Sequence, residues 1–275
     1  MNFLNKLPGP LLVFLGACAL SFGGLIVKSF EGANLWQILF WRSVFFSIVV
    51  LFFLLTTYKK NFFNSIYKIG LPGFFGGIVL SCGYAGYVFA MYNTTVANAN
   101  FIIQTQTIFL AVFGYIFLKE KITIFTITSI FLAFGGIFLM LGSSLTSGQM
   151  IGNIAAFIMP ISFAVLILTV RKYPNVDMIP LQLIAGIGAI IIGYIFSSKI
   201  ILSSHDLFLG FIFITIGAKT TPSALVGIIM LIEAILGPLW AWLFINETPP
   251  IVVLVGGTIV LLAVVLQFFN RKIVK

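Results

Sequence analysis

Residues 228–247 read IIMLIEAILGPLWAWLFINE, and this stretch decides the fold because it is an almost unbroken apolar run. A helix of about 20 apolar residues is long enough to cross the roughly 30 Å hydrocarbon core of a bilayer. Glu233 lies near the middle of the run, where an ionised side chain costs roughly 2.5 to 3.5 kcal/mol. Such residues usually face a cavity or a partner. The stretch therefore predicts a transmembrane helix that carries a functional carboxylate.

The composition of the whole chain also indicates a membrane environment. Of its 275 residues, 61% are hydrophobic and 8% are charged, and the mean hydropathy is +1.19. Too few polar side chains are present to cover a water-soluble globule. The net charge of +9 would suggest nucleic acid binding in a soluble protein, but membrane topology produces the same excess. We therefore expect an integral membrane protein with no nucleic acid partner.

Apolar segments that could cross a bilayer recur along the whole chain. Each segment is continuous rather than alternating, which favours helices over a β-barrel. We predict an all-α membrane protein of ten transmembrane helices in a single domain, residues 1–275. The segments cover residues 9–28, 34–56, 70–91, 97–118, 123–142, 152–171, 179–197, 207–218, 222–245 and 249–270. The eighth, 207–218, has only 12 residues, or about 18 Å of helix.

The positions of lysine and arginine predict the orientation of the chain. With a cytoplasmic N-terminus and ten crossings, twelve of these residues lie inside, whereas Lys28 and Lys199 lie outside. This asymmetry follows the positive-inside rule. Without segment eight, the last two helices would be inverted and the basic C-terminus would lie outside. We therefore expect the short segment to cross and both termini to be cytoplasmic.

An internal repeat divides the chain into two halves. Residues 90–120 align with residues 217–247 without a gap, at an offset of 127, and Glu120 meets Glu247. The predicted repeats cover residues 9–142 and 152–270. Because five helices is an odd number, the second repeat is inverted relative to the first. Two inverted halves can exchange conformations around a site at the bilayer midplane, which favours a transporter.

Other functional classes fit the sequence less well. An intramembrane enzyme needs clustered catalytic side chains, and the only histidine, His205, lies in a predicted loop. Cys18 and Cys82 fall in predicted spans, where packing is favoured over a disulfide or a metal site. We expect no enzymatic activity, cofactor or metal. The alternative function is a non-transporting membrane subunit that packs against a partner protein.

Three stretches of the sequence carry a family resemblance. They are FWRSVFF at residues 40–46, FGYIFLKE with KITIFTITSIFLAFGGIFLML at residues 113–141, and IGAKTTPSALVGIIMLIEAILGPLWAWLFINETPP at residues 216–250. Together they resemble the drug/metabolite transporter superfamily in its ten-helix EamA-type branch. The resemblance implies a carrier of the inner (plasma) membrane that exports small metabolites such as amino acids. Segment eight is shorter than the family pattern.

Four polar residues at different depths are candidates for the substrate site. Glu233 lies in segment nine, and the repeat places Gln106 at the equivalent point of segment four. We expect Gln106 to face the cavity, although bonding to neighbouring helices is the alternative for the QTQT run. Asn100 lies nearer the outer mouth, and Ser21 lies near the middle of segment one.

Three further candidates come from segments two and three. Arg42 could clamp a substrate carboxylate, pair with Glu233 or extend outward to the membrane surface. Tyr84 and Tyr87 are three residues apart on one helical face, so their hydroxyls could line a cavity. Packing beside neighbouring glycines is the alternative for both tyrosines.

The remaining segments suggest structural roles. Segments five and ten carry few polar residues, so we expect them to support the other helices or to form the contacts of a homodimer. Pro160 and Pro238 predict kinks in segments six and nine. Trp240 and Trp242 lie toward the outer end of segment nine, as expected for an aromatic belt.

Overall fold

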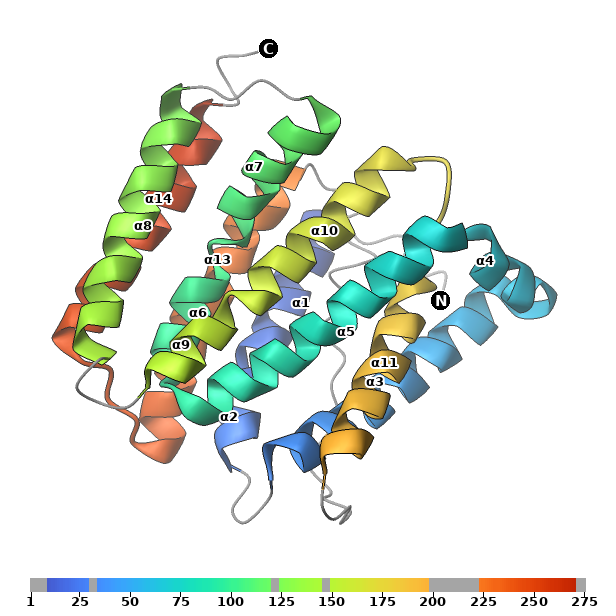
Figure 1. Ribbon diagram of the computed structural model, residues 1–275, viewed down its shortest axis with the longest axis horizontal. Coiled ribbons are helices and arrows are strands. Elements are labelled where there is room, and N and C mark those ends of the chain that lie inside the picture. The colour runs from blue at the N-terminus through green and yellow to red at the C-terminus, as the bar shows by residue number, and fades with distance from the viewer. Residues whose placement is uncertain (1–8, 30–33, 120–123, 145–148, 198–222, 271–275) are drawn as a thin grey trace.

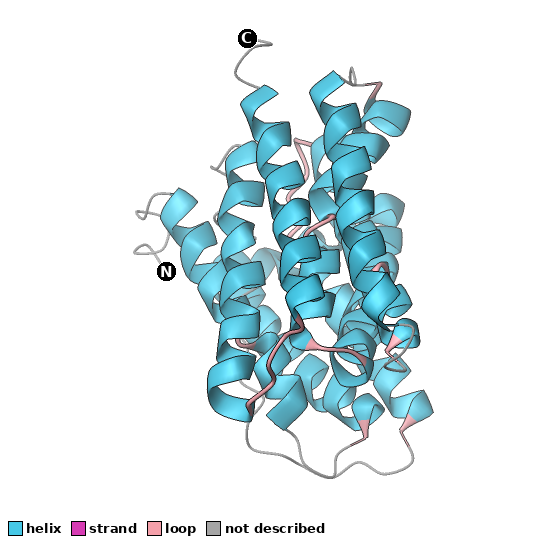
Figure 2. Ribbon diagram, turned by 90° about the vertical axis from the view of Figure 1, so that its left-hand side faces the viewer, coloured by secondary structure: helices cyan, strands magenta, loops and turns pink. Residues whose placement is uncertain are grey.

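The computed structural model describes residues 9–29, 34–119, 124–144, 149–197 and 223–270. Within these residues the chain consists of helices and short connections, with no strand (Figure 2). The all-α prediction is confirmed. Segment eight, His205 and Glu120 lie outside the described residues.

The described helices form one bundle (Figure 1). In chain order they are α1 (Gly9–Ser21), α2 (Gly23–Ser29), α3 (Leu35–Tyr58), the 3₁₀ turn η2 (Lys59–Asn61), α4 (Phe62–Lys68), α5 (Gly70–Asn93), α6 (Val96–Ile103), α7 (Gln106–Leu118), α8 (Ile124–Ser144), α9 (Met150–Ala156), α10 (Ile158–Lys172), α11 (Leu181–Phe196), α13 (Ser223–Ile245) and α14 (Ile251–Asn270).

Apolar helical stretches occur at nine of the predicted segments. Four are long and apolar enough to cross a membrane: Leu35–Lys68, Gly70–Asn93, Val96–Leu118 and Met150–Lys172. Five shorter apolar stretches are Phe14–Ser29, Ile127–Met140, Leu181–Phe196, Ile232–Ile245 and Ile251–Ala263. The total of ten helices stays a prediction, because segment eight lies outside the described part of the chain.

The outside of the bundle is covered with large apolar side chains. Phe52, Phe131, Phe138 and Ile251 are 69%, 75%, 78% and 79% exposed. Soluble monomers rarely expose such surfaces over a wide area, whereas lipid tails solvate them well. The surface therefore agrees with a membrane-embedded bundle.

Three of the predicted segments are interrupted helices. The breaks occur at Phe22 between α1 and α2, at 104–105 between α6 and α7, and at Phe157 between α9 and α10. Pro160 explains the third break, because a proline ring clashes with the carbonyl group four residues earlier, and that residue, Ala156, ends α9. Segment six is thus interrupted before its proline. Pro238, by contrast, lies inside the uninterrupted helix α13.

The helix bounds of the two halves agree with the 127-residue offset. Equivalent positions are the starts of α6 and α13 (Val96 and Ser223), the ends of α7 and α13 (Leu118 and Ile245), and the starts of α8 and α14 (Ile124 and Ile251). Lys119 and Asn246 are also equivalent, and both are left-handed, with φ of 56° and 54°. A left-handed residue ends a helix. These matches support the internal repeat, whereas its outer bounds, 9–142 and 152–270, stay predictions.

The packing of the helices follows the same symmetry. Helix α3 packs on α11 and α8 packs on α14, and each pair joins corresponding helices of the two halves (Figure 1). Helix α1 packs on α13, and α10 packs on α7 in the corresponding way. Exchanging the two halves leaves this pattern unchanged, as expected for an inverted repeat.

Glycines bring α8 and α14 into backbone contact. A Cβ atom added at Gly136 would lie 2.5 Å from the carbonyl oxygen of Gly256, and one added at Gly256 would lie 2.5 Å from that of Gly136. Small residues allow such close helix contacts in membranes. Segments five and ten thus support each other within one chain, and the homodimer stays a prediction.

Candidate functional site

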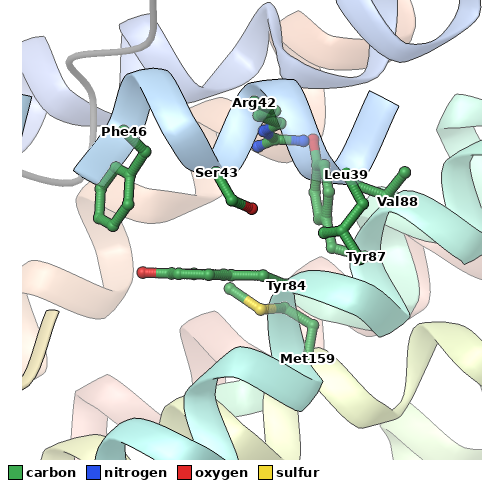
Figure 3. A pocket seen from close by; sticks show the side chains of 8 residues that line it. All are labelled: Leu39, Arg42, Ser43, Phe46, Tyr84, Tyr87, Val88 and Met159. Carbon is green, nitrogen blue, oxygen red and sulfur yellow. The ribbon is translucent and has the colours of Figure 1, made fainter. Parts of the chain in front are cut away.

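A pocket lies between α3, α5 and α10 (Figure 3). Its empty volume is about 370 Å³, including the space at its open mouth. The lining residues are Leu39, Arg42, Ser43, Phe46, Tyr84, Tyr87, Val88 and Met159. Apolar and aromatic walls with a few polar groups are typical of small-molecule sites. The predicted residues Arg42, Tyr84 and Tyr87 therefore meet in one cavity.

Arg42 projects from α3 toward Tyr87 of α5. Its Cζ atom lies 4.6 Å from the centre of the Tyr87 ring. A cation over an aromatic face is attracted by the ring quadrupole, and more strongly when water is excluded. The side chain thus lies against the pocket wall.

Tyr84 lies across the pocket (Figure 3) and is held by a hydrogen bond and a ring contact. Its hydroxyl donates a hydrogen bond of 2.7 Å to Oε1 of Gln182, at the start of α11. Its ring meets Phe46 edge-on, with ring centres 5.5 Å apart. Edge-to-face aromatic pairs are a favoured arrangement. The aromatic wall is therefore fixed in position.

Glu233 lies on α13, beside the pocket rather than in its lining. Its side chain is buried, with 5% exposed. It interacts electrostatically with both Arg42 and Tyr87. Glu233 and Arg42 thus lie close enough to influence each other, and the pairing of their charges stays a prediction.

Ser21 and Trp240 bind each other where segment one is interrupted. The Ser21 hydroxyl donates to the Cys18 carbonyl oxygen at 2.6 Å and accepts from Trp240 Nε1 at 2.9 Å. The Trp240 ring stacks on Phe22, with centres 4.8 Å apart. Trp240 therefore joins α13 to α1, and its place in an aromatic belt stays a prediction. Trp242, which is 53% exposed, fits the belt.

Gln106 and Asn100 are buried but do not line the pocket. Gln106 is the first residue of α7, directly after the break in segment four. Asn100 packs against α13, because a Cβ atom added at Gly237 would lie 1.9 Å from its Nδ2 atom. Gln104, at the break, is fully buried, and its amide has no hydrogen-bond partner in the described part of the chain. The substrate contacts of Gln106, Asn100 and Ser21 stay predictions.

Comparison with known families decides the identity of the chain. A family model described as the EamA-like transporter family matches residues 7–142. The chain belongs to the EamA-like transporter family. A solved crystal structure is similar at a TM-score of 0.64, covering 94% of this chain and 97% of that chain at 14% identity, which shows the fold alone. A search of curated proteins finds no match.

As an EamA-like transporter, the chain is a multi-pass membrane protein that moves small solutes across a lipid bilayer. The predicted resemblance is confirmed. The matched residues contain the whole pocket lining except Met159. Among the described residues, no group of three His, Cys, Asp or Glu side chains gathers as a metal site would require.

Several pocket residues of this EamA-like transporter were not predicted from the sequence. Leu39 and Phe46 are one turn of α3 before and after Arg42, Ser43 directly follows Arg42, and Val88 follows Tyr87 on α5. Helical spacing from Arg42 would have identified Leu39 and Phe46, but not Ser43. Met159 and Gln182 had no such signal, because they belong to helices that only the fold brings to the pocket.

Proposed function

We propose that the chain is a secondary transporter that exports small amphipathic solutes by exposing the Arg42 pocket alternately to the two sides of the membrane. The single observation that carries this proposal is a guanidinium group placed in an aromatic cavity among apolar helices. A charged side chain is expensive at this depth, and such residues usually mark a solute pathway. The protein lies in the inner (plasma) membrane in this proposal, with both termini cytoplasmic.

The lining supports an amphipathic solute. Arg42 supplies a planar group of donors that suits a carboxylate, because a guanidinium can bind both carboxylate oxygens at once. Phe46, Tyr84 and Met159 supply an apolar wall for the rest of the molecule. Ser43 offers a hydroxyl on the same helical face as Arg42.

Glu233 supplies a countercharge for Arg42 when no solute is bound. Two opposite charges in a low-dielectric interior stabilise each other, and an isolated one is costly. An anionic solute group at Arg42 would compete with Glu233. Solute binding would then weaken the attraction between α3 and α13, two helices from different repeats. This competition would link occupancy of the pocket to the relative position of the two halves.

The proposal is tested first by a metabolite screen of the medium of cells with and without the gene. Solutes that accumulate outside only with the gene are then loaded into proteoliposomes, and their flux is measured. We expect Arg42→Gln to abolish saturable flux, whereas Lys68→Gln, an equivalent loss of charge at an exposed position, should leave it unchanged. A protein that moves no solute and co-purifies stoichiometrically with another protein would support the membrane-subunit alternative.

A further inference from the structure

Glu247 joins three separate elements at one end of the bundle. Its Oε2 atom lies 3.0 Å from Nζ of Lys28, in the last turn of α2. Its Oε1 atom accepts a hydrogen bond of 2.6 Å from the backbone N–H of Val96, the first residue of α6. The two side chains are only 23% and 17% exposed, so solvent screens the pair less than a fully exposed one. Charge-assisted bonds of this kind are stronger than neutral ones.

Helix α2 connects this ion pair to the pocket. At its first residue, Gly23, an added Cβ atom would lie 2.5 Å from the Tyr87 hydroxyl and 3.5 Å from an Arg42 nitrogen. At Gly24, an added Cβ atom would lie 2.7 Å from the side chain of Val96. The seven residues of α2 thus run from the polar end of the pocket to Lys28.

The interruption at Phe22 separates α2 from an anchored α1. Phe22 stacks on Trp240 of α13, and Ser21 accepts the Trp240 hydrogen bond, so the chain is fixed just before α2 begins. Beyond this anchor, α2 packs on α13 and α5 through Gly23, Gly24 and the buried Val27, and the Lys28–Glu247 pair holds its other end. A short helix that is fixed at one end and bonded at the other can swing about its fixed end.

We propose that α2 is a gate over the Arg42 pocket, and that the Lys28–Glu247 ion pair, anchored on the Val96 N–H, is the lock that keeps it closed. The proposal rests on the proposed function only in taking the Arg42 pocket as the solute site. Breaking the ion pair frees the Lys28 end of α2 and uncovers the pocket toward the predicted outer face. In the structure the ion pair is formed.

The test measures access to the pocket directly, without any need for a known solute. A single cysteine replaces Ser43, whose hydroxyl faces the pocket (Figure 3), in a chain with Cys18→Ala and Cys82→Ser. A membrane-impermeant thiol reagent is applied to cells, and the labelling rate is followed. Glu247→Gln and Lys28→Met should each raise the rate roughly two- to fivefold, as expected for loss of a partly exposed ion pair. Lys68→Met, which removes a charge at another exposed position, should not.

Two further variants fix the interpretation. Thr248→Cys, an exposed position next to Glu247, should label rapidly with or without the ion pair and reports which side that end faces. Lys28→Met removes the ion pair but keeps the hydrogen bond from Val96 to Glu247. If Glu247→Gln does not fold, the labelling rate in Lys28→Met is sufficient to test the gate. Equal Ser43→Cys labelling in folded Lys28→Met and in the unaltered protein would overturn the gate. The labelling rates test the gate and the flux measurement tests the transport proposal, so either proposal can fail while the other stands.

Discussion

Arg42 and Tyr87 form a cation–π contact within the pocket wall, with the Arg42 Cζ atom 4.6 Å from the centre of the Tyr87 ring. The contact joins α3 to α5 and aims the guanidinium group at the cavity. A flexible charged side chain is thereby held in one orientation before a solute arrives. Preorganisation of this kind increases affinity because less conformational freedom is lost on binding.

Replacing Tyr87 should weaken solute binding in proportion to what is removed. Tyr87→Phe keeps the aromatic face and loses the hydroxyl, whereas Tyr87→Leu loses both. A cation–π contact contributes about 0.5 to 2 kcal/mol, so Tyr87→Leu should raise the KM for flux roughly 2- to 30-fold. Tyr92→Leu, on the exposed surface of the same helix, is the matched control. An unchanged KM in Tyr87→Leu would show that the contact does not orient Arg42.

Arg42 and Glu233 should depend on each other for stability. If Glu233 neutralises Arg42, Glu233→Gln leaves a buried cation without its countercharge, at a cost of roughly 3 to 5 kcal/mol. The folded yield should fall, and adding Arg42→Gln to the same chain should restore it. Size-exclusion chromatography of the detergent-solubilised protein measures both. Wild-type yield together with wild-type flux in Glu233→Gln would contradict this pairing and any transport role for the carboxylate.

Two adjacent glycines on α8 should respond oppositely to alanine. A Cβ atom at Gly136 would lie 2.5 Å from a backbone oxygen of α14, whereas one at Gly135 would meet nothing within 4 Å. Gly136→Ala must push the helices apart, and overpacking of this kind costs roughly 1 to 3 kcal/mol. Gly135→Ala should be neutral or slightly stabilising, because alanine favours helix. Thermal unfolding in detergent compares the two, and equal midpoints would refute the tight contact between α8 and α14.

The orientation of the chain can be mapped with single cysteines. Cysteines at Ser144 and Thr248 should label from outside the cell with an impermeant reagent, whereas cysteines at Lys60 and Lys172 should not. Lys60 lies in η2 after α3, Ser144 ends α8, Lys172 ends α10, and Thr248 lies between α13 and α14. Labelling from outside of a cysteine added after Lys275 would contradict ten crossings and would indicate that segment eight does not span the membrane.

The spans and three of the eight pocket residues could be predicted from the sequence because their signals are local. Hydrophobic runs predicted α8 at 123–142, and it occupies Ile124–Ser144. Arg42 and the pair of tyrosines stood out because charge and hydroxyl groups are costly in lipid. The bond from Trp240 to Ser21 joins residues 219 apart, and no sequence pattern indicates such a partner. Pro160 predicted a kink in segment six, and the break lies three residues earlier, at Phe157, because a proline acts on the preceding turn.

The backbone contact between Gly136 and Gly256 bears on how the two halves hold together. Under the 127-residue offset, the equivalent pair is Ala263 with Ser129, and both are small and fully buried. The contact between α8 and α14 therefore contains two pairs of small residues that the repeat relates to each other. In the same way, an isologous interface between two separate subunits contains each contact twice. An interface of this kind does not depend on a covalent connection. Two fragments cut between the repeats and produced together should reassemble, with the contact between α8 and α14 as their dimer interface.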